Sequence, residues 1–226
     1  MRLPWRKEKT MTGLIWKDFL IMRKTLKSYL LIMALYAVLA YLDILNYGFI
    51  ITFIQVALMV LPISAFAYDE QAKWDRYAMS LPMGCRAMVG ARYLFVLTLS
   101  LLTTALGLAS IALLTLFRAE DPVEMVVTLM VSAAIGLLIP SFLLPLCYKL
   151  GPERARPFLY AIIFIPTIVL VLLFKANILD LSILENLDVL TTAQLIGYAL
   201  LLPLGGLALL ALSCLVSFHI AAGKEY

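Results

Sequence analysis

The side chains best suited to chemistry gather in one charged segment, Tyr68 to Arg92, which lies between two long apolar blocks. Its first charged residues are the acids Asp69 and Glu70. Acidic side chains stabilise the first turn of a helix because they complement the positive end of its dipole. A short charged helix is therefore predicted over 69–79. Ser80–Leu81–Pro82 would end it, since the residue before a proline avoids the α conformation.

Two interpretations of this helix stay open on spacing alone. Its cations, Lys73 and Arg76, suit contact with a soluble partner, because complementary charges fix how two proteins dock. Its rings, Trp74 and Tyr77, suit the membrane interface, where aromatic side chains anchor a protein at the level of the headgroups.

Side chains for catalysis are scarce elsewhere. His219 is the single histidine, whereas a hydrolytic triad or a histidine-rich metal site needs further partners. Cys85, Cys147 and Cys214 are far apart and lack metal-ligand spacing, so no metal site is predicted. No phosphate-cradling G-x-x-x-x-G-K-[ST] loop is present, so the chain cannot bind ATP in that manner. An intramembrane enzyme is a weak alternative.

The elements that must position the charged segment are long apolar blocks. Of the 226 residues, 64% are hydrophobic and 14% charged, and the mean hydropathy is +1.00. A soluble domain would carry about 25% charged residues. About 20 apolar residues in a helix cross a hydrocarbon core, and a backbone in lipid must satisfy its own hydrogen bonds. The sequence predicts an all-α membrane protein with six spans: 28–45, 49–67, 93–117, 125–148, 158–174 and 193–220.

The segments outside the spans complete a single transmembrane domain over 1–226. An amphipathic elbow helix is predicted within 1–27, where apolar positions recur at helical spacing between basic ones. The spans of the 28–220 bundle are joined on one side by the long loop 68–92. An outer re-entrant region is predicted between spans five and six, over 175–192, and a short tail covers 221–226.

The distribution of cations orients the bundle. Sixteen of the 18 Lys and Arg residues flank one side of the predicted spans, and only Arg118 and Lys175 lie on the other. Positive residues stay on the cytoplasmic side of a membrane. Both termini are therefore predicted to be cytoplasmic, and the basic excess is a topology signal rather than a nucleic-acid patch.

The middles of the spans contain no Asp, Glu, Lys or Arg, which disfavours proton coupling, although sodium coupling through carbonyl groups stays open. Thr52, Gln55 and Ser64 are the candidates for a substrate pathway, with structural hydrogen bonding as the simpler role. Prolines inside or near the ends of spans, such as Pro145, either shape the helices or act as hinges.

Two motifs carry a resemblance to a known family. Residues 14–20, LIWKDFL, and residues 68–82, YDEQAKWDRYAMSLP, resemble those of small ABC-2-type transporter permeases, and the second motif is the more specific. The compact bacterial group that includes the phenol-soluble modulin exporter permeases is most similar. The resemblance covers the whole chain in layout and implies a permease of the bacterial cell membrane. It also implies pairing with a second permease chain and docking of two separate ATPase subunits.

The resemblance also implies roles for individual residues. A coupling helix would enter a cleft in the ATPase, the elbow would pack beside it, and the connector 151–156 would make a lesser contact. The residues so implicated are Glu70, Lys73, Trp74, Asp75, Arg76 and Tyr77 in the coupling helix, Lys17 and Asp18 in the elbow, and Arg154 in the connector. This chain would bind no cofactor, since ATP and magnesium would belong to the partner.

Spans without fixed charge suit an amphipathic cargo better than a small ion. The resemblance favours amphipathic peptides, with drugs or lipids next. The alternative to an ABC exporter subunit is a stand-alone channel or secondary carrier. Homodimer and heterodimer are both compatible with the sequence.

Overall fold

The computed structural model describes residues 5–42, 47–74, 84–117, 122–176 and 192–223. Within these ranges the chain forms six helices and no strand, which confirms the all-α prediction for the described part. The helices are α1 (Trp5–Tyr41), α2 (Tyr47–Gln71), α4 (Gly84–Phe117), α5 (Pro122–Leu150), α6 (Pro152–Lys175) and α8 (Thr192–Ala222).

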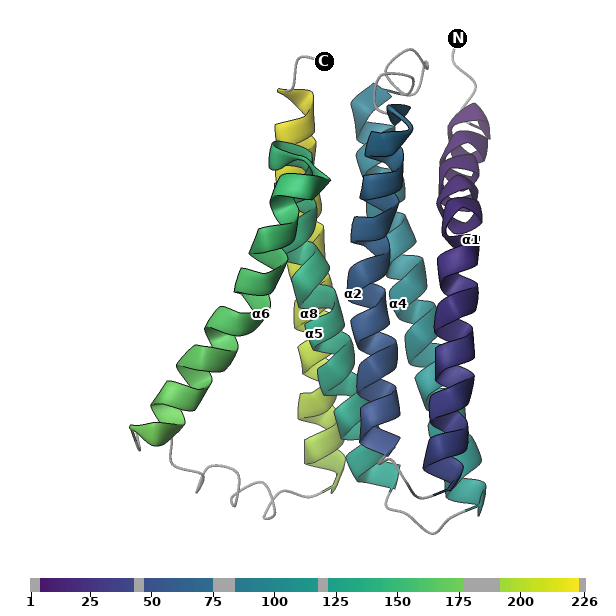
Figure 1. The fold of residues 1–226 in the computed structure, drawn as a ribbon, viewed down its shortest axis with the longest axis vertical. Coiled ribbons are helices and arrows are strands. Elements are labelled where there is room, and N and C mark those ends of the chain that lie inside the picture. Colours follow the sequence, from purple (N-terminus) through teal and green to yellow (C-terminus); the bar gives the residue numbers. More distant parts are fainter. Residues whose placement is uncertain (1–4, 43–46, 75–83, 118–121, 177–191, 224–226) are drawn as a thin grey trace.

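Successive helices run in opposite directions, so the start of α1 and the end of α8 lie at the same end of the bundle (Figure 1). Helix α5 is central and packs against α2, α4, α6 and most extensively α8. Helix α1 lies at one side and packs on α2 and α4. The end that holds the start of α1, the end of α2 and the start of α4 is called the α1 end below.

Four of the described helices are long and apolar enough to cross a membrane, over Ala87–Ala112, Pro122–Leu150, Pro152–Lys175 and Gln194–Ala222. These four correspond to the predicted spans three to six. Residues 28–41 of the first predicted span lie in α1, and its last residues, 43–45, lie outside the described part; the second predicted span lies within α2. The crossing of the membrane by these two spans stays a prediction. Most of the predicted re-entrant region lies outside the described residues.

Helix α1 differs from the expected elbow followed by a separate span. It is continuous across Lys27 and Ser28. No proline or glycine occurs between Gly13 and Tyr41, so nothing in the sequence interrupts the backbone hydrogen bonds. At 1.5 Å per residue its 37 residues span roughly 55 Å, more than the hydrocarbon core requires.

The charged segment also begins differently from the prediction. Asp69 and Glu70 lie in the last turn of α2, not in the first turn of a separate helix. The apolar stretch before them continues the helix, which ends in a turn where Lys73 has a positive φ of 50°. Residues 75–83 lie outside the described part, so most of the predicted coupling helix does too. Helix α4 starts at Gly84, before the predicted third span.

Helices α5 and α6 are joined through one residue, Gly151, whose φ of 85° suits glycine. Pro152 then occupies the start of α6, where the absence of an N–H does no harm. Ala155 and Leu159 pack against α2 and α5. Farther along, α6 leans away from the bundle and leaves large apolar side chains such as Phe164 exposed (Figure 1).

The interface between α5 and α8 depends on a close approach at Gly206. A Cβ added there would lie 3.1 Å from Leu137 Cβ and 3.5 Å from the carbonyl oxygen of Ala134. Only a residue without a side chain fits this contact unless the neighbouring helix moves.

Candidate functional site

Four charged side chains from three helices meet near the α1 end and form what we call the ion cluster. Lys17 Nζ of α1 lies 2.8 Å from Asp69 Oδ1 of α2 and 3.3 Å from the Asp18 carboxylate. Arg92 of α4 pairs with both acids: its Nη1 is 3.0 Å from Asp18 Oδ2, and its Nη2 donates to Asp69 Oδ2. The cluster therefore links α1, α2 and α4 through charge.

The ion cluster is buried and neutral. The side chains of Asp18, Asp69 and Arg92 are 5–7% exposed, and that of Lys17 is 21% exposed. Burial raises the pKa of Asp18, because loss of hydration outweighs the attraction of Arg92 and Lys17. Two cations against two anions leave no net charge, which makes such burial tolerable.

An aromatic ring lies against each of the two cations of the cluster, Lys17 and Arg92. Lys17 Nζ lies 4.2 Å from the centroid of the Trp74 ring, just beyond the end of α2. Arg92 Cζ lies 4.6 Å from the centroid of Phe66, and Phe66 meets Tyr148 of α5 edge-to-face at 5.0 Å. Cation–ring contacts of this kind are favourable, the more so when desolvated. The cluster thus contacts the ring of Trp74, just beyond α2, and reaches α5 through Phe66 and Tyr148.

The structure brings some of the predicted contact residues together and separates others. Lys17, Asp18 and Trp74 belong to one site. Glu70 lies beside the α5–α6 turn, with Oε1 3.6 Å from the point that a Cβ on Gly151 would occupy. The side chains of Lys73 and Arg154 are exposed, the latter in the first turn of α6.

Three of the predicted contact residues, Asp75, Arg76 and Tyr77, lie outside the described residues. Among those that the structure does describe, no group of three or more His, Cys, Asp or Glu side chains is placed to hold a metal ion.

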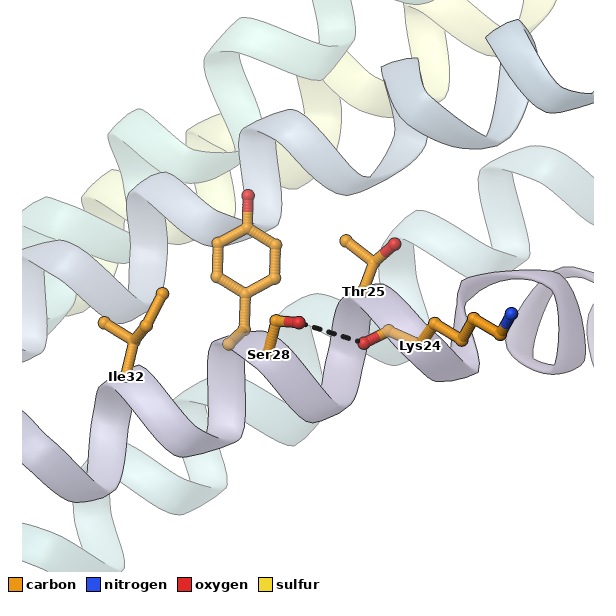
Figure 2. Close-up of a pocket in the computed structure, with 5 residues that line it drawn as sticks. Lys24, Thr25, Ser28 and Ile32 are labelled. Atoms are coloured by element: carbon orange, nitrogen blue, oxygen red, sulfur yellow. Dashed lines mark hydrogen bonds between the residues drawn. The ribbon is translucent and has the colours of Figure 1, made fainter.

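The predicted pathway residues all lie on α2. Ser64 is half-buried, whereas the side chains of Thr52 and Gln55 are outside the description. A hollow of about 400 Å³ lies beside α1, lined by Lys24, Thr25, Ser28, Tyr29 and Ile32 (Figure 2). The centroid of the Tyr29 ring lies 6.5 Å from that of Phe53 of α2, the residue after Thr52.

Sequence reasoning did not select Asp69 and Arg92 as site residues, although they complete the ion cluster. The signal was present, since both are charges placed next to long apolar blocks. A buried charge that extends an apolar helix requires a partner of opposite sign. The pairing itself depends on the packing of three helices.

A comparison with protein families decides the identity of the chain. The model described as "ABC-2 family transporter protein" matches residues 13–222. The chain belongs to the ABC-2 transporter family. No curated protein and no solved structure matched in the corresponding comparisons. Membership makes the chain a multi-pass membrane component of a transporter that is not itself catalytic, and it confirms the resemblance seen in the two sequence motifs.

The ion cluster holds three helices together near the α1 end through charge-assisted contacts. Trp74, just beyond the end of α2, lies against Lys17 of this cluster.

Proposed function

We propose that this chain is the membrane-spanning permease subunit of an ABC exporter in a bacterial cell membrane. It would pair with a second permease chain and work with two separate ATPase subunits, which bind ATP and magnesium. The single observation that carries the proposal is the buried ion cluster, whose Lys17 lies against Trp74 of the charged segment. Family membership and the absence of a phosphate-binding loop in the sequence support it.

The ATPase subunits would dock at the α1 end. The cation count supports a cytoplasmic position for this end and for both termini, since 16 of 18 Lys and Arg residues flank that side of the predicted spans. The proposed contact residues are Trp74 together with Glu70, Lys73, Asp75, Arg76, Tyr77 and Arg154. Asp18 is buried, so its role would be to hold Arg92 rather than to touch a partner.

Closure of the ATPase pair would move the charged segment, and the ion cluster would share that movement among three helices. The charge-assisted contacts favour one relative geometry of the three helices, so a displacement of one helix would be carried to the other two. The energy for transport would enter in this way from outside the bilayer, which agrees with the absence of Asp, Glu, Lys and Arg from the middles of the predicted spans.

The proposed cargo is an amphipathic peptide, with drugs or other amphipathic molecules as related possibilities. The hollow beside α1 supports this choice, because it offers one cation, Lys24, among hydroxyl and apolar groups (Figure 2). Thr52, Gln55 and Ser64 of the neighbouring α2 are the proposed pathway residues.

The test is the variant Trp74→Ala in the chain purified with its ATPase partner. Loss of the ring removes the contact with Lys17, and we expect binding of the ATPase to weaken by about tenfold, as for an aromatic anchor of an interface. Pull-down and nucleotide hydrolysis in nanodiscs measure it. The matched control is Tyr198→Ala, which removes an exposed ring near the start of α8, at the opposite end of the bundle.

Two results would overturn the proposal. One is unchanged ATPase binding and hydrolysis in Trp74→Ala with the fold intact. The other is transport of an amphipathic peptide by vesicles that hold this chain alone, without any ATPase. That second result would instead establish a stand-alone channel or secondary carrier.

A further inference from the structure

Pro145 leaves one carbonyl group of α5 without its helical donor. In a helix, the N–H of residue 145 would donate to the carbonyl oxygen of Ser141, but proline has no N–H. Ser141 is buried, and an unsatisfied buried carbonyl is costly. Its own hydroxyl is engaged elsewhere, since Ser141 Oγ donates to the carbonyl oxygen of Leu137 at 2.7 Å.

A side chain of α8 supplies the missing donor. Ser213 Oγ donates to the carbonyl oxygen of Ser141, across the interface between the two helices. Ser213 is 7% exposed, so water does not compete for this contact. The proline-interrupted turn of α5 is therefore tied to α8 rather than to its own helix.

Tyr93 of α4 extends this contact into a chain of hydroxyl groups. Its hydroxyl oxygen lies 2.7 Å from Ser213 Oγ and 2.7 Å from Ser217 Oγ. Ser213 and Ser217 are four residues apart, so they share one face of α8. All three residues are buried.

The direction of the hydrogen bonds follows from the number of protons. Ser213 has one hydroxyl proton, which it gives to Ser141, so in its contact with Tyr93 it must accept. Tyr93 then donates to Ser213 and accepts from Ser217. The order is Ser217 to Tyr93 to Ser213 to the Ser141 carbonyl, and every hydroxyl proton is used.

The middle member of this chain of hydroxyl groups, Tyr93, is the neighbour of an ion-cluster residue. Arg92 and Tyr93 are consecutive residues of α4, and consecutive side chains of a helix point about 100° apart. Arg92 faces α1 and α2, whereas Tyr93 faces α8 and belongs to the apolar core formed with α5. Helix α4 thus connects the ion cluster to the turn of α5 at Pro145, where a side chain of α8 satisfies the carbonyl group of Ser141.

We propose that Tyr93, with Ser213 and Ser217, is a positioning element that transmits displacement of the ion cluster to the proline-interrupted turn of α5. Its transport role rests on the proposed function above, whereas the hydrogen-bond order does not. Tyr93 would touch neither cargo nor nucleotide. It would keep the turn of α5 at Pro145 at a fixed position relative to Arg92.

The first experiment tests the hydrogen-bond order by thermal unfolding of the purified chain in detergent. Ser213→Ala leaves the carbonyl oxygen of Ser141 without a hydrogen-bond donor, and we expect Tm to fall by about 3–8 °C. Pro145→Ala restores the helical donor, so in that background the same change should lower Tm by less than half as much. Equal losses in both backgrounds would overturn the proposal. The control Ser110→Ala removes a hydroxyl that donates within α4, to the carbonyl oxygen of Gly107, and should cost the same in both backgrounds.

The second experiment tests transmission with the chain reconstituted with its ATPase. Tyr93→Phe keeps the ring and removes the hydroxyl, and we expect peptide transported per ATP hydrolysed to fall by about threefold or more while ATPase binding is unchanged. An unchanged transport ratio would overturn the transmission role. If no ATPase binds the chain at all, the proposed function fails, but the first experiment still decides the hydrogen-bond order.

Discussion

Two consecutive residues of α4 serve two polar regions of different character. Arg92 belongs to the ion cluster with α1 and α2, which is held by full charges, whereas Tyr93 belongs to a neutral chain of hydroxyl groups with α8 and α5. A buried charge that loses its partner costs far more than a buried hydroxyl that does. Loss of one residue should therefore destabilise the ion cluster strongly and the chain of hydroxyl groups only moderately. Helix α4 is thus held by ion pairs on the side of α1 and α2, and by weaker hydrogen bonds on the side of α8 and α5.

The largest effect is expected from breaking the ion cluster. Asp69→Ala leaves Arg92 with one acidic partner and Lys17 with only its neighbour Asp18, and we expect a loss of about 3–5 kcal/mol in the free energy of unfolding. Unfolding in mixed detergent micelles measures it. Glu70→Ala is the matched control, since Glu70 is exposed in the same turn of α2 and should lose no more than about 0.5 kcal/mol. Equal losses for the two variants would show that the cluster does not hold the helices.

An intermediate effect is expected from the interface between α5 and α8, on the side of the hydroxyl chain. Gly206→Ala places a methyl group 3.1 Å from Leu137 Cβ, and we expect a loss of about 1–3 kcal/mol. Gly205→Ala meets nothing within 4 Å and should be neutral or stabilising by up to about 1 kcal/mol, because alanine favours the helix. The same denaturation experiment compares the two. A destabilised Gly205→Ala would contradict the close approach at Gly206.

The smallest change in stability is expected when the whole ion cluster is made apolar. We expect Lys17→Met, Asp18→Leu, Asp69→Leu and Arg92→Met together to stay within about 2 kcal/mol of the parent, because no charge is left unpaired. The amount of peptide transported per ATP hydrolysed should nevertheless fall by about tenfold, because the charge-assisted contacts that couple the three helices are lost. Met22→Leu, a conservative change in the apolar contact of the same three helices, is the control. Full transport by the apolar variant would show that the charges are not needed for coupling.

The sequence predicts the helices well and their ends poorly. Length and hydropathy place spans three to six within the four helices suited to a membrane, because a bilayer demands a fixed length of apolar helix. The ends are less certain, because charged residues can extend an apolar helix when tertiary partners neutralise them. Asp69 shows this: read alone it predicts a new helix start, but Lys17 and Arg92 allow it to complete α2.

The candidate site could be predicted only in part. The two motifs with Lys17, Asp18 and Trp74 pointed to the right end of the bundle, since their composition is unusual beside apolar blocks. Arg92 could not be assigned to it, because its partner Asp18 is distant in the sequence and leaves no local signal. The contacts of the α8 serines were unpredictable for the same reason. The contact between Ser213 and Ser141 joins residues 72 positions apart.

The single-residue turn between α5 and α6 has a geometrical consequence. Gly151 is followed at once by Pro152, so the angle between the two helices is set by very few backbone torsions. Helix α6 has 24 residues and is roughly 36 Å long. A change of about 10° at Gly151 would carry its far end through roughly 6 Å. A small rotation of α6 about Gly151, near the α1 end, would therefore produce a large displacement at the opposite end of the bundle.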